Sequence, residues 1–145
     1  MAESNNAGRL PLMFVDYEGP ADSGRIMMRI GRDFAIVEYS RHPMVVTKVA
    51  PWRKKMTLDT GDVRHLFLLL LSENVREYKC SSLTLSPGQD ITIKSISVAS
   101  GKSPPFFTCS FVEKTPPPLV DVMKELELIY RKVKEKGEDI SPQRR

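Results

Sequence analysis

The stretch Arg25–Gly31 (RIMMRIG) has the pattern that decides the fold. In an extended chain its two faces carry Ile26, Met28 and Ile30 on one side and Arg25, Met27 and Arg29 on the other. Successive side chains of a β-strand point to opposite faces, so this period of two is typical of a half-buried strand. The pattern predicts a strand whose apolar face enters a core and whose arginines point away from it together.

Four further short runs surround this strand and are separated by turn residues. They are Leu12–Asp16, closed by Gly19-Pro20, then Phe34–Tyr39, Met44–Ala50 and Lys54–Leu58. Parallel neighbours need long crossover connections, whereas these connections are short. The first part of the chain therefore predicts an antiparallel meander.

The hydrophobic period then changes from two to that of a helix. The apolar positions are Val63, Leu66, Phe67, Leu70 and Leu71, continuing to Val75 and Tyr78. Asp59 or Thr60 can cap the first turn, and Asp62 suits the positive end of the helix dipole. Because Leu66–Leu71 is apolar all round, we expect this helix to be covered on more than one side. We interpret four of its residues as a homodimer interface: Leu66, Phe67, Leu70 and Leu71.

The second half repeats this order of elements. Its expected strands are Ser82–Ser86, Ile91–Val98, with a bulge between Ile93 and Ile96, and Phe106–Glu113. A helix of about four or five turns follows, with Pro118 in its first turn and Gly137 at its end. The fold class is therefore α+β, in the order antiparallel strands, helix, strands, helix, with the sheet packed against two amphipathic helices.

The chain of 145 residues has the length of a single domain. We expect a flexible N-terminus over residues 1–10, one α+β domain over 11–136 and a mobile tail over 137–145. Within the domain, residues 11–79 form strands plus a helix, and residues 80–136 do so again. The longest apolar run has six residues, too few to span a membrane, and residues 1–7 lack the features of a secretory signal. Two cysteines, Cys80 and Cys109, suggest free thiols in an intracellular, reducing compartment.

The positive charge is concentrated in one part of the sequence. The net charge of the chain is +4, and residues 21–60 hold eight basic residues against four acidic ones. A basic sheet face attracts polyanions, and single-stranded nucleic acid also needs aromatic rings on which bases stack. Tyr39 and Trp52 are the aromatic candidates. The candidate nucleic-acid-binding residues are Arg25, Arg29, Arg41, Lys48, Trp52, Arg53, Lys54 and Lys55.

Signatures of catalysis are scarce. The two histidines, His42 and His65, and the two cysteines have no metal-type spacing, and no phosphate-binding glycine loop or nucleophile elbow occurs. The sequence therefore predicts a protein that is not an enzyme, with no catalytic residues, no metal and no cofactor.

One segment resembles a known family. Residues Pro51–Asp59 (PWRKKMTLD), followed by a helix, are similar to a stretch of the positive-cofactor-four transcriptional coactivators, and the order of elements is similar to the related Whirly fold. Both families bind single-stranded nucleic acid on their sheets and assemble through their helices. The resemblance implies that Arg53 and Lys54 contact nucleic acid. The Whirly signature Lys-Gly-Lys-Ala-Ala-Leu is missing, and the second half has only three expected strands.

The sequence thus predicts a single-stranded DNA- or RNA-binding protein that acts as a homodimer and does not span a membrane. The alternative is a protein–protein interaction domain, either a pleckstrin-homology-like sandwich with the helix Leu119–Val133 across one end, or a self-assembling regulatory or viral protein.

Overall fold

The computed structural model describes residues 10–41, 46, 49–80, 92–101, 103–112 and 114–140. Most of the expected N-terminal segment 1–10, and residues 141–145 of the expected tail, lie outside this part of the chain. Leu10, at the beginning of the described part, is buried in the core. Among the described residues, no helix combines the length and the apolar character that crossing a membrane requires.

Strands and helices follow one another along the chain in several groups. The first strands are β1 (Met13–Ala21), β2 (Gly24–Ile30), β3 (Phe34–Arg41) and β4 (Trp52–Thr57). The helices α2 (Thr60–Leu71) and α3 (Glu73–Arg76) precede β5 (Lys94–Ser100) and β6 (Pro105–Phe111). The 3-10 turn η2 (Pro117–Leu119) leads into α4 (Val120–Lys136), and β7 (Glu138–Asp139) comes last.

The described strands form one continuous sheet in the order β6-β5-β1-β2-β3-β4-β7, and all neighbours are antiparallel. The fold is therefore α+β, as the sequence predicts. β5 pairs with β1, so the strands of the second half extend the sheet of the first half. Glu138–Asp139, within the expected tail, pairs with β4.

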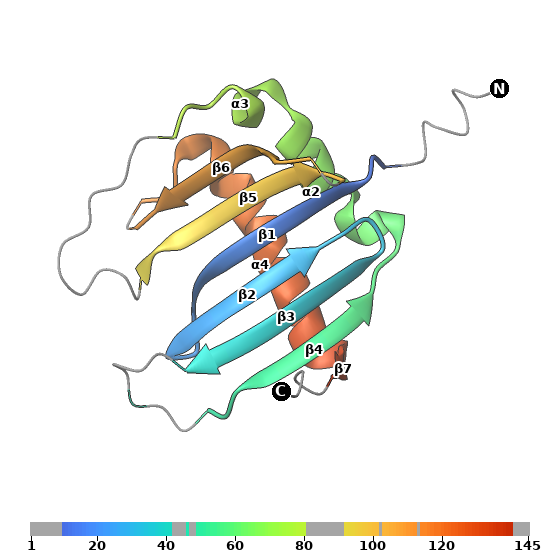
Figure 1. Cartoon of the computed structure of the whole chain (residues 1–145), viewed down its shortest axis with the longest axis vertical. Helices are drawn as coiled ribbons and strands as arrows, with labels where there is room; N and C mark the ends of the chain where they lie inside the picture. Colours follow the sequence, from blue (N-terminus) through green and yellow to red (C-terminus); the bar gives the residue numbers. More distant parts are fainter. Residues whose placement is uncertain are drawn as a thin grey trace.

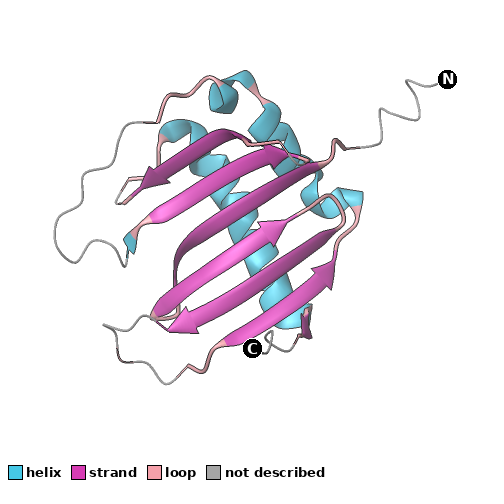
Figure 2. Cartoon of the chain, viewed as in Figure 1, coloured by secondary structure: helices cyan, strands magenta, loops and turns pink. Residues whose placement is uncertain are grey.

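Both long helices cover the same face of this sheet. In Figure 1, α2 and α4 lie behind the strands, and the face toward the viewer carries none of the described helices. Figure 2 shows the same two layers by secondary structure. The core lies between the layers, where α4 contributes Val122, Leu126, Ile129 and Val133. Burial of these stripes stabilises the two-layer arrangement, because each apolar side chain removed from water contributes about 1.5–3 kcal/mol.

β2 has the alternation that its sequence predicts. Ile26, Met28 and Ile30 are buried, while Met27 and Arg29 are exposed. β1 is longer than expected because Gly19-Pro20 continues the strand instead of closing it. β5 pairs with β1 only as far as Glu18, so among the described strands Pro20 has a neighbour on one side only. Such an edge position tolerates a residue without an amide hydrogen.

Two other expected strands differ from the structure or lie outside it. Ser82–Ser86 and most of Met44–Ala50 are not among the described residues, and Val46, Val49 and Ala50 are in no strand. The partner of β3 is instead β4. The irregularity expected between Ile93 and Ile96 occurs further along, between Val98 and Ala99.

α2 begins with a capping box. The Asp62 amide donates to the Asp59 carboxylate at 3.1 Å, and the Asp59 amide donates to Asp62 at 2.9 Å. The helix does not continue to Tyr78 as expected, because Ser72 takes an extended conformation and its hydroxyl donates to the Leu69 carbonyl. Chain direction changes there, and α3 is a separate turn.

The expected homodimer interface is not available on α2. Leu66, Phe67 and Leu70 have 0% exposure because they pack in the chain's own core, and Leu71 is half-buried against it. We therefore correct the assignment of these four residues to an interface. The expectation that this helix is covered on more than one side is also wrong, because Leu68 on its other face is 52% exposed.

The expectation of two free thiols is wrong. A disulfide joins Cys80, just after α3, to Cys109 on β6. The two residues are 29 positions apart in sequence, and their Cα atoms are 5.4 Å apart. Because disulfides persist mainly in oxidising environments, this bond removes the argument for a reducing compartment.

Candidate nucleic-acid interface

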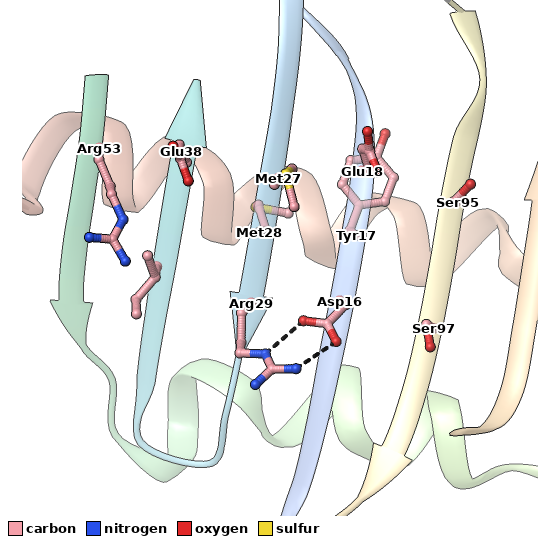
Figure 3. Close-up of a pocket in the computed structure, with 11 residues that line it drawn as sticks. Asp16, Tyr17, Glu18, Met27, Met28, Arg29, Glu38, Arg53, Ser95 and Ser97 are labelled. Atoms are coloured by element: carbon pink, nitrogen blue, oxygen red, sulfur yellow. Dashed lines mark hydrogen bonds and ion pairs between the residues drawn. The ribbon is translucent and has the colours of Figure 1, made fainter. Parts of the chain in front are cut away.

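The face of the sheet that no described helix covers, called the open face from here on, has a central hollow of about 550 Å³. Figure 3 shows its lining residues, which come from strands β1 to β5. Strand register places the side chains of the open face, including most of those that line the hollow, in two rows across the sheet. One row is Thr108, Ser97, Asp16, Arg29, Ile36 and Lys55, and the other is Ser110, Ser95, Glu18, Met27, Glu38 and Arg53.

Arg29 is held in place by an acidic neighbour. Its guanidinium donates to both oxygens of Asp16, at 2.8 and 3.0 Å, as the dashed lines in Figure 3 show. These hydrogen bonds raise the pKa of Arg29 above its ordinary value. A bidentate pair of this kind fixes the plane of the guanidinium. The Arg29 guanidinium therefore contacts solvent, but the Asp16 carboxylate already neutralises part of its charge.

Arg25 has a structural task. Its guanidinium donates to the Ile93 carbonyl at 2.9 Å and lies 3.5 Å from Glu18, and its side chain is only 16% exposed. These contacts tie β2 to the residue just before β5. Arg25 is on the open face, but little of its charge is accessible there.

Arg53 and Lys55 are the accessible cations of this face. They point to the same side of β4 as Glu38 and Ile36 of β3, their direct cross-strand neighbours. Among the described residues, neither side chain has a hydrogen-bond or ion-pair partner. Asp16 and Glu18 lie on β1, which β2 and β3 separate from β4. The charge of the open face is thus unequal, acidic over β1 and basic over β4.

Trp52 and Lys54 lie on the opposite, helix-covered side of β4. Trp52 stacks between Tyr39 and Tyr130, with ring centroids 6.1 and 6.3 Å apart. The Lys54 ammonium donates to the Lys134 carbonyl at 2.6 Å near the end of α4. The expectation that Trp52, Lys54 and Tyr39 share a face with Arg53 is therefore wrong, because alternation along β4 separates them.

The remaining two candidates lie at or beyond the end of β3. Arg41 ends β3 and donates to the Val49 carbonyl at 3.2 Å, away from the two central rows. Lys48 lies outside the described residues. Of the eight predicted residues, the structure brings Arg25, Arg29, Arg53 and Lys55 to one face.

Sequence reasoning missed two aromatic residues of the open face. Phe14 on β1 and Phe34 on β3 are half-buried, and their ring centroids are 6.3 Å apart. Gly31, just after β2, leaves room for the Phe34 ring, because a Cβ at this position would overlap that ring. The Arg29 guanidinium lies 5.3 Å from the centre of the Phe14 ring. The sequence does contain a signal for them: Phe14 and Phe34 alternate with the buried residues Met13, Val15 and Ala35, which places both rings on the opposite face of their strands.

No cluster of three or more His, Cys, Asp or Glu side chains that could hold a metal occurs in the described part of the chain. Comparison with known proteins gives no match, whether to a family model, a curated protein or a solved structure. The arrangement itself must therefore suggest the function.

Proposed function

We propose that this protein is a non-enzymatic single-stranded DNA- or RNA-binding protein and that the strand lies on the open face. The observation that carries the proposal is the conjunction of two neighbouring phenylalanine rings with basic residues that have no ion-pair partner among the described residues, on a surface that no described helix covers. Single-strand-binding surfaces combine these two kinds of group, cations along the phosphates and rings beneath the bases.

The geometry suggests a path for the strand. Phe34 and Ile36 occupy consecutive open-face positions of β3, and Lys55 is the direct neighbour of Ile36 on β4. Bases above Phe14 and Phe34 would leave phosphates beside Lys55 and Arg53. The acidic residues Asp16 and Glu18 disfavour a backbone running over β1. We therefore assign the phosphate side to β4.

Binding to cationic side chains releases counterions, so the affinity falls as salt rises. The test is a fluorescence-anisotropy titration of labelled oligothymidylate and oligouridylate at about 50 and about 200 mM salt. The doubly substituted Arg53→Glu/Lys55→Glu protein should lose at least about tenfold in affinity at the lower salt. Absence of binding by the unaltered protein at low salt would overturn the proposal.

A matched control changes the total charge equally. Arg64 on α2 and Lys136 on α4 are exposed and lie on the helices, away from the open face. Arg64→Glu/Lys136→Glu should therefore retain most of the affinity. Equal losses in the two double variants would mean that net charge alone drives binding, which contradicts an open-face site.

A second candidate function is recognition of a protein partner on the same face. The specific observation is the three carboxylates of Asp16, Glu18 and Glu38 interleaved with the cations, because complementary mixed charges give protein interfaces their specificity. If this second function is correct, the protein does not bind the oligonucleotides. Substitutions on the open face would instead abolish binding of the protein partner. The pleckstrin-homology-like form of this alternative expects two packed sheets, whereas the described strands form one.

A further inference from the structure

A second cleft, of about 410 Å³, lies on the helix-covered side of the sheet, between α4 and the hairpin of β1 and β2. Its volume falls within the range of about 300–1,000 Å³ that is common for small-molecule sites. The apolar part of its wall consists of Ala21, Ile26, Met28, Met123 and Leu126. This cleft takes no part in the proposed function of the open face.

Tyr17 supplies a hydrogen-bond donor to this cleft. Its side chain is only 7% exposed and its ring lies along β1, where a Cβ at Gly19 would overlap the hydroxyl. Among the described residues, this hydroxyl has no hydrogen-bond partner within the protein, and its oxygen keeps contact with solvent, because no buried polar side-chain atom there lacks a partner. Burial raises the pKa of Tyr17 to about 12, so the group remains a protonated donor in neutral solution.

The hydroxyls of the two neighbouring tyrosines, Tyr39 and Tyr130, both have hydrogen-bond partners within the protein. Tyr39 donates to the Asp22 carbonyl at 2.7 Å, and Tyr130 donates to the Asp22 carboxylate at 2.8 Å. Both therefore clamp the turn between β1 and β2. The Tyr17 hydroxyl lines the cleft without such a partner, so an acceptor on a bound molecule would replace water at this donor.

The charges around the cleft leave a positive excess. Its two carboxylates, Asp22 and Glu127, already have cationic partners, Lys134 at 2.8 Å and Arg131 at 2.7 Å. The two lysines of its wall are Lys94 and Lys124. Lys94 lies 6.0 Å from the centre of the Phe111 ring, and Lys124 has a loose, exposed pair with Asp121 at 3.8 Å. An anionic group would thus be favoured at the mouth.

We propose that this cleft binds a small amphipathic acid, with its apolar body against Ile26, Met28 and Leu126 and its carboxylate near Lys94 and Lys124. The Tyr17 hydroxyl donates a hydrogen bond to the bound molecule. The apolar wall selects the body, and the lysines select a negative head over a neutral or positive one. The inference is independent of the proposed function, because the cleft and the open face lie on opposite sides of the sheet.

The test is a titration of the protein with decanoate, followed by amide chemical shifts in two-dimensional NMR spectra. The expected result is saturable binding with shifts that concentrate on β1, β2 and α4, and much weaker binding of decanol and decylamine. Tyr17→Phe removes only the hydroxyl and should weaken binding about tenfold, the equivalent of one good hydrogen bond to a charged group. No binding of decanoate at millimolar concentration, or shifts confined to another region, would overturn the proposal.

Two further variants keep the test independent of folding. Lys94→Gln/Lys124→Gln should reduce the preference for decanoate over decanol, whereas Lys114→Gln/Lys136→Gln, two exposed lysines that do not line the cleft, should leave it unchanged. Identical losses in both pairs would show only a general charge effect and would overturn the assigned site. Oligonucleotide binding, measured in parallel, should be unaffected by Tyr17→Phe, so the failure of one proposal does not imply failure of the other.

Discussion

The two faces of the sheet are built from the same strands but have different environments. On the covered face, Val15, Ile30 and Val37 have 0% exposure under the helices. On the open face, the residues that alternate with these buried ones contact solvent. Met27 is 57% exposed, and Arg29 forms an ion pair with Asp16. Alternate residues of one strand thus serve stability and surface chemistry separately. A substitution can therefore affect one property and spare the other.

The composition of the open face is informative because a solvated sheet face normally alternates to polar residues. Met27, Ile36, Phe14 and Phe34 depart from this rule, although no described helix covers them. Their contribution to the core is small, since the core lies on the other side. The proposed binding on the open face would explain their presence there.

The largest expected effect contrasts the two faces directly. Phe67 of α2 is fully buried, so Phe67→Ala should lower the free energy of unfolding by about 3–5 kcal/mol. Met27→Ala, on the open face, should change it by no more than about 0.5 kcal/mol. Urea denaturation followed by circular dichroism measures both. A loss at Met27 comparable to that at Phe67 would contradict the division between the faces.

The disulfide between Cys80 and Cys109 gives the next largest expected effect. Cys109 is buried on β6, and the bond closes a loop with a sequence separation of 29. Cys80→Ala/Cys109→Ala should lower the free energy of unfolding by about 3–4 kcal/mol, mainly because the unfolded chain gains freedom. The same denaturation experiment measures it. Dithiothreitol should destabilise the unaltered protein and leave the double variant unchanged; equal sensitivity of both to the reductant speaks against the bond.

The third prediction concerns Phe14 and Phe34 on the open face. Phe14→Leu and Phe34→Leu keep apolar volume but remove the ring, and each should weaken oligonucleotide binding by about 1–3 kcal/mol. Anisotropy titrations measure this loss. The urea midpoint should stay close to that of the unaltered protein. Leu128→Ala, at an exposed position of α4, is the control and should change neither property.

The smallest effect is a pH dependence at the contact between α2 and α4. The Lys132 ammonium donates to Asp62 at 2.6 Å and, together with the Asp59 amide, holds the pKa of Asp62 below its ordinary value of 3.8. The resulting stabilisation is present above that ordinary value and is lost as the pH falls through the lowered pKa of the folded state. Asp62→Asn should cost about 1 kcal/mol at neutral pH.

The measurement is a pair of urea titrations for each protein, at about pH 7 and about pH 2. The difference between Asp62→Asn and the unaltered protein should shrink or vanish at the lower pH. An equal difference at both values would mean that the carboxylate charge contributes nothing at this contact. The open face provides the reference, because Glu18→Gln should have a smaller effect at neutral pH.

Local periodicity predicted much of this fold, and long-range contacts account for most errors. The alternation of β2 and the helical stripe of α4 depend on their own sequence, and both occur as expected. The pairing of β5 with β1 and the bond between Cys80 and Cys109 join distant segments, for which spacing carries no information. Gly19-Pro20 is typical of a turn when the local sequence is considered alone. It continues β1 because Pro20 needs a neighbouring strand on one side only, and this depends on how the whole sheet is paired.

The candidate site followed the same division. Basic residues were identified by composition, which does not distinguish the sides of a strand, so Trp52 and Lys54 were grouped with Arg53 and Lys55. Strict use of the alternation along Trp52–Thr57 separates the two pairs without a structure. The cross-strand pair of Phe14 and Phe34 depends on the register of three strands, so the sequence alone shows their phase but not their contact.

The bond between Cys80 and Cys109 also changes what proteolysis of this protein would reveal. One backbone cut between these residues leaves two fragments that remain covalently joined. They would migrate as one band under denaturing conditions and separate only when a reductant is added. Intact mass on a non-reducing gel is therefore no proof of an intact chain here.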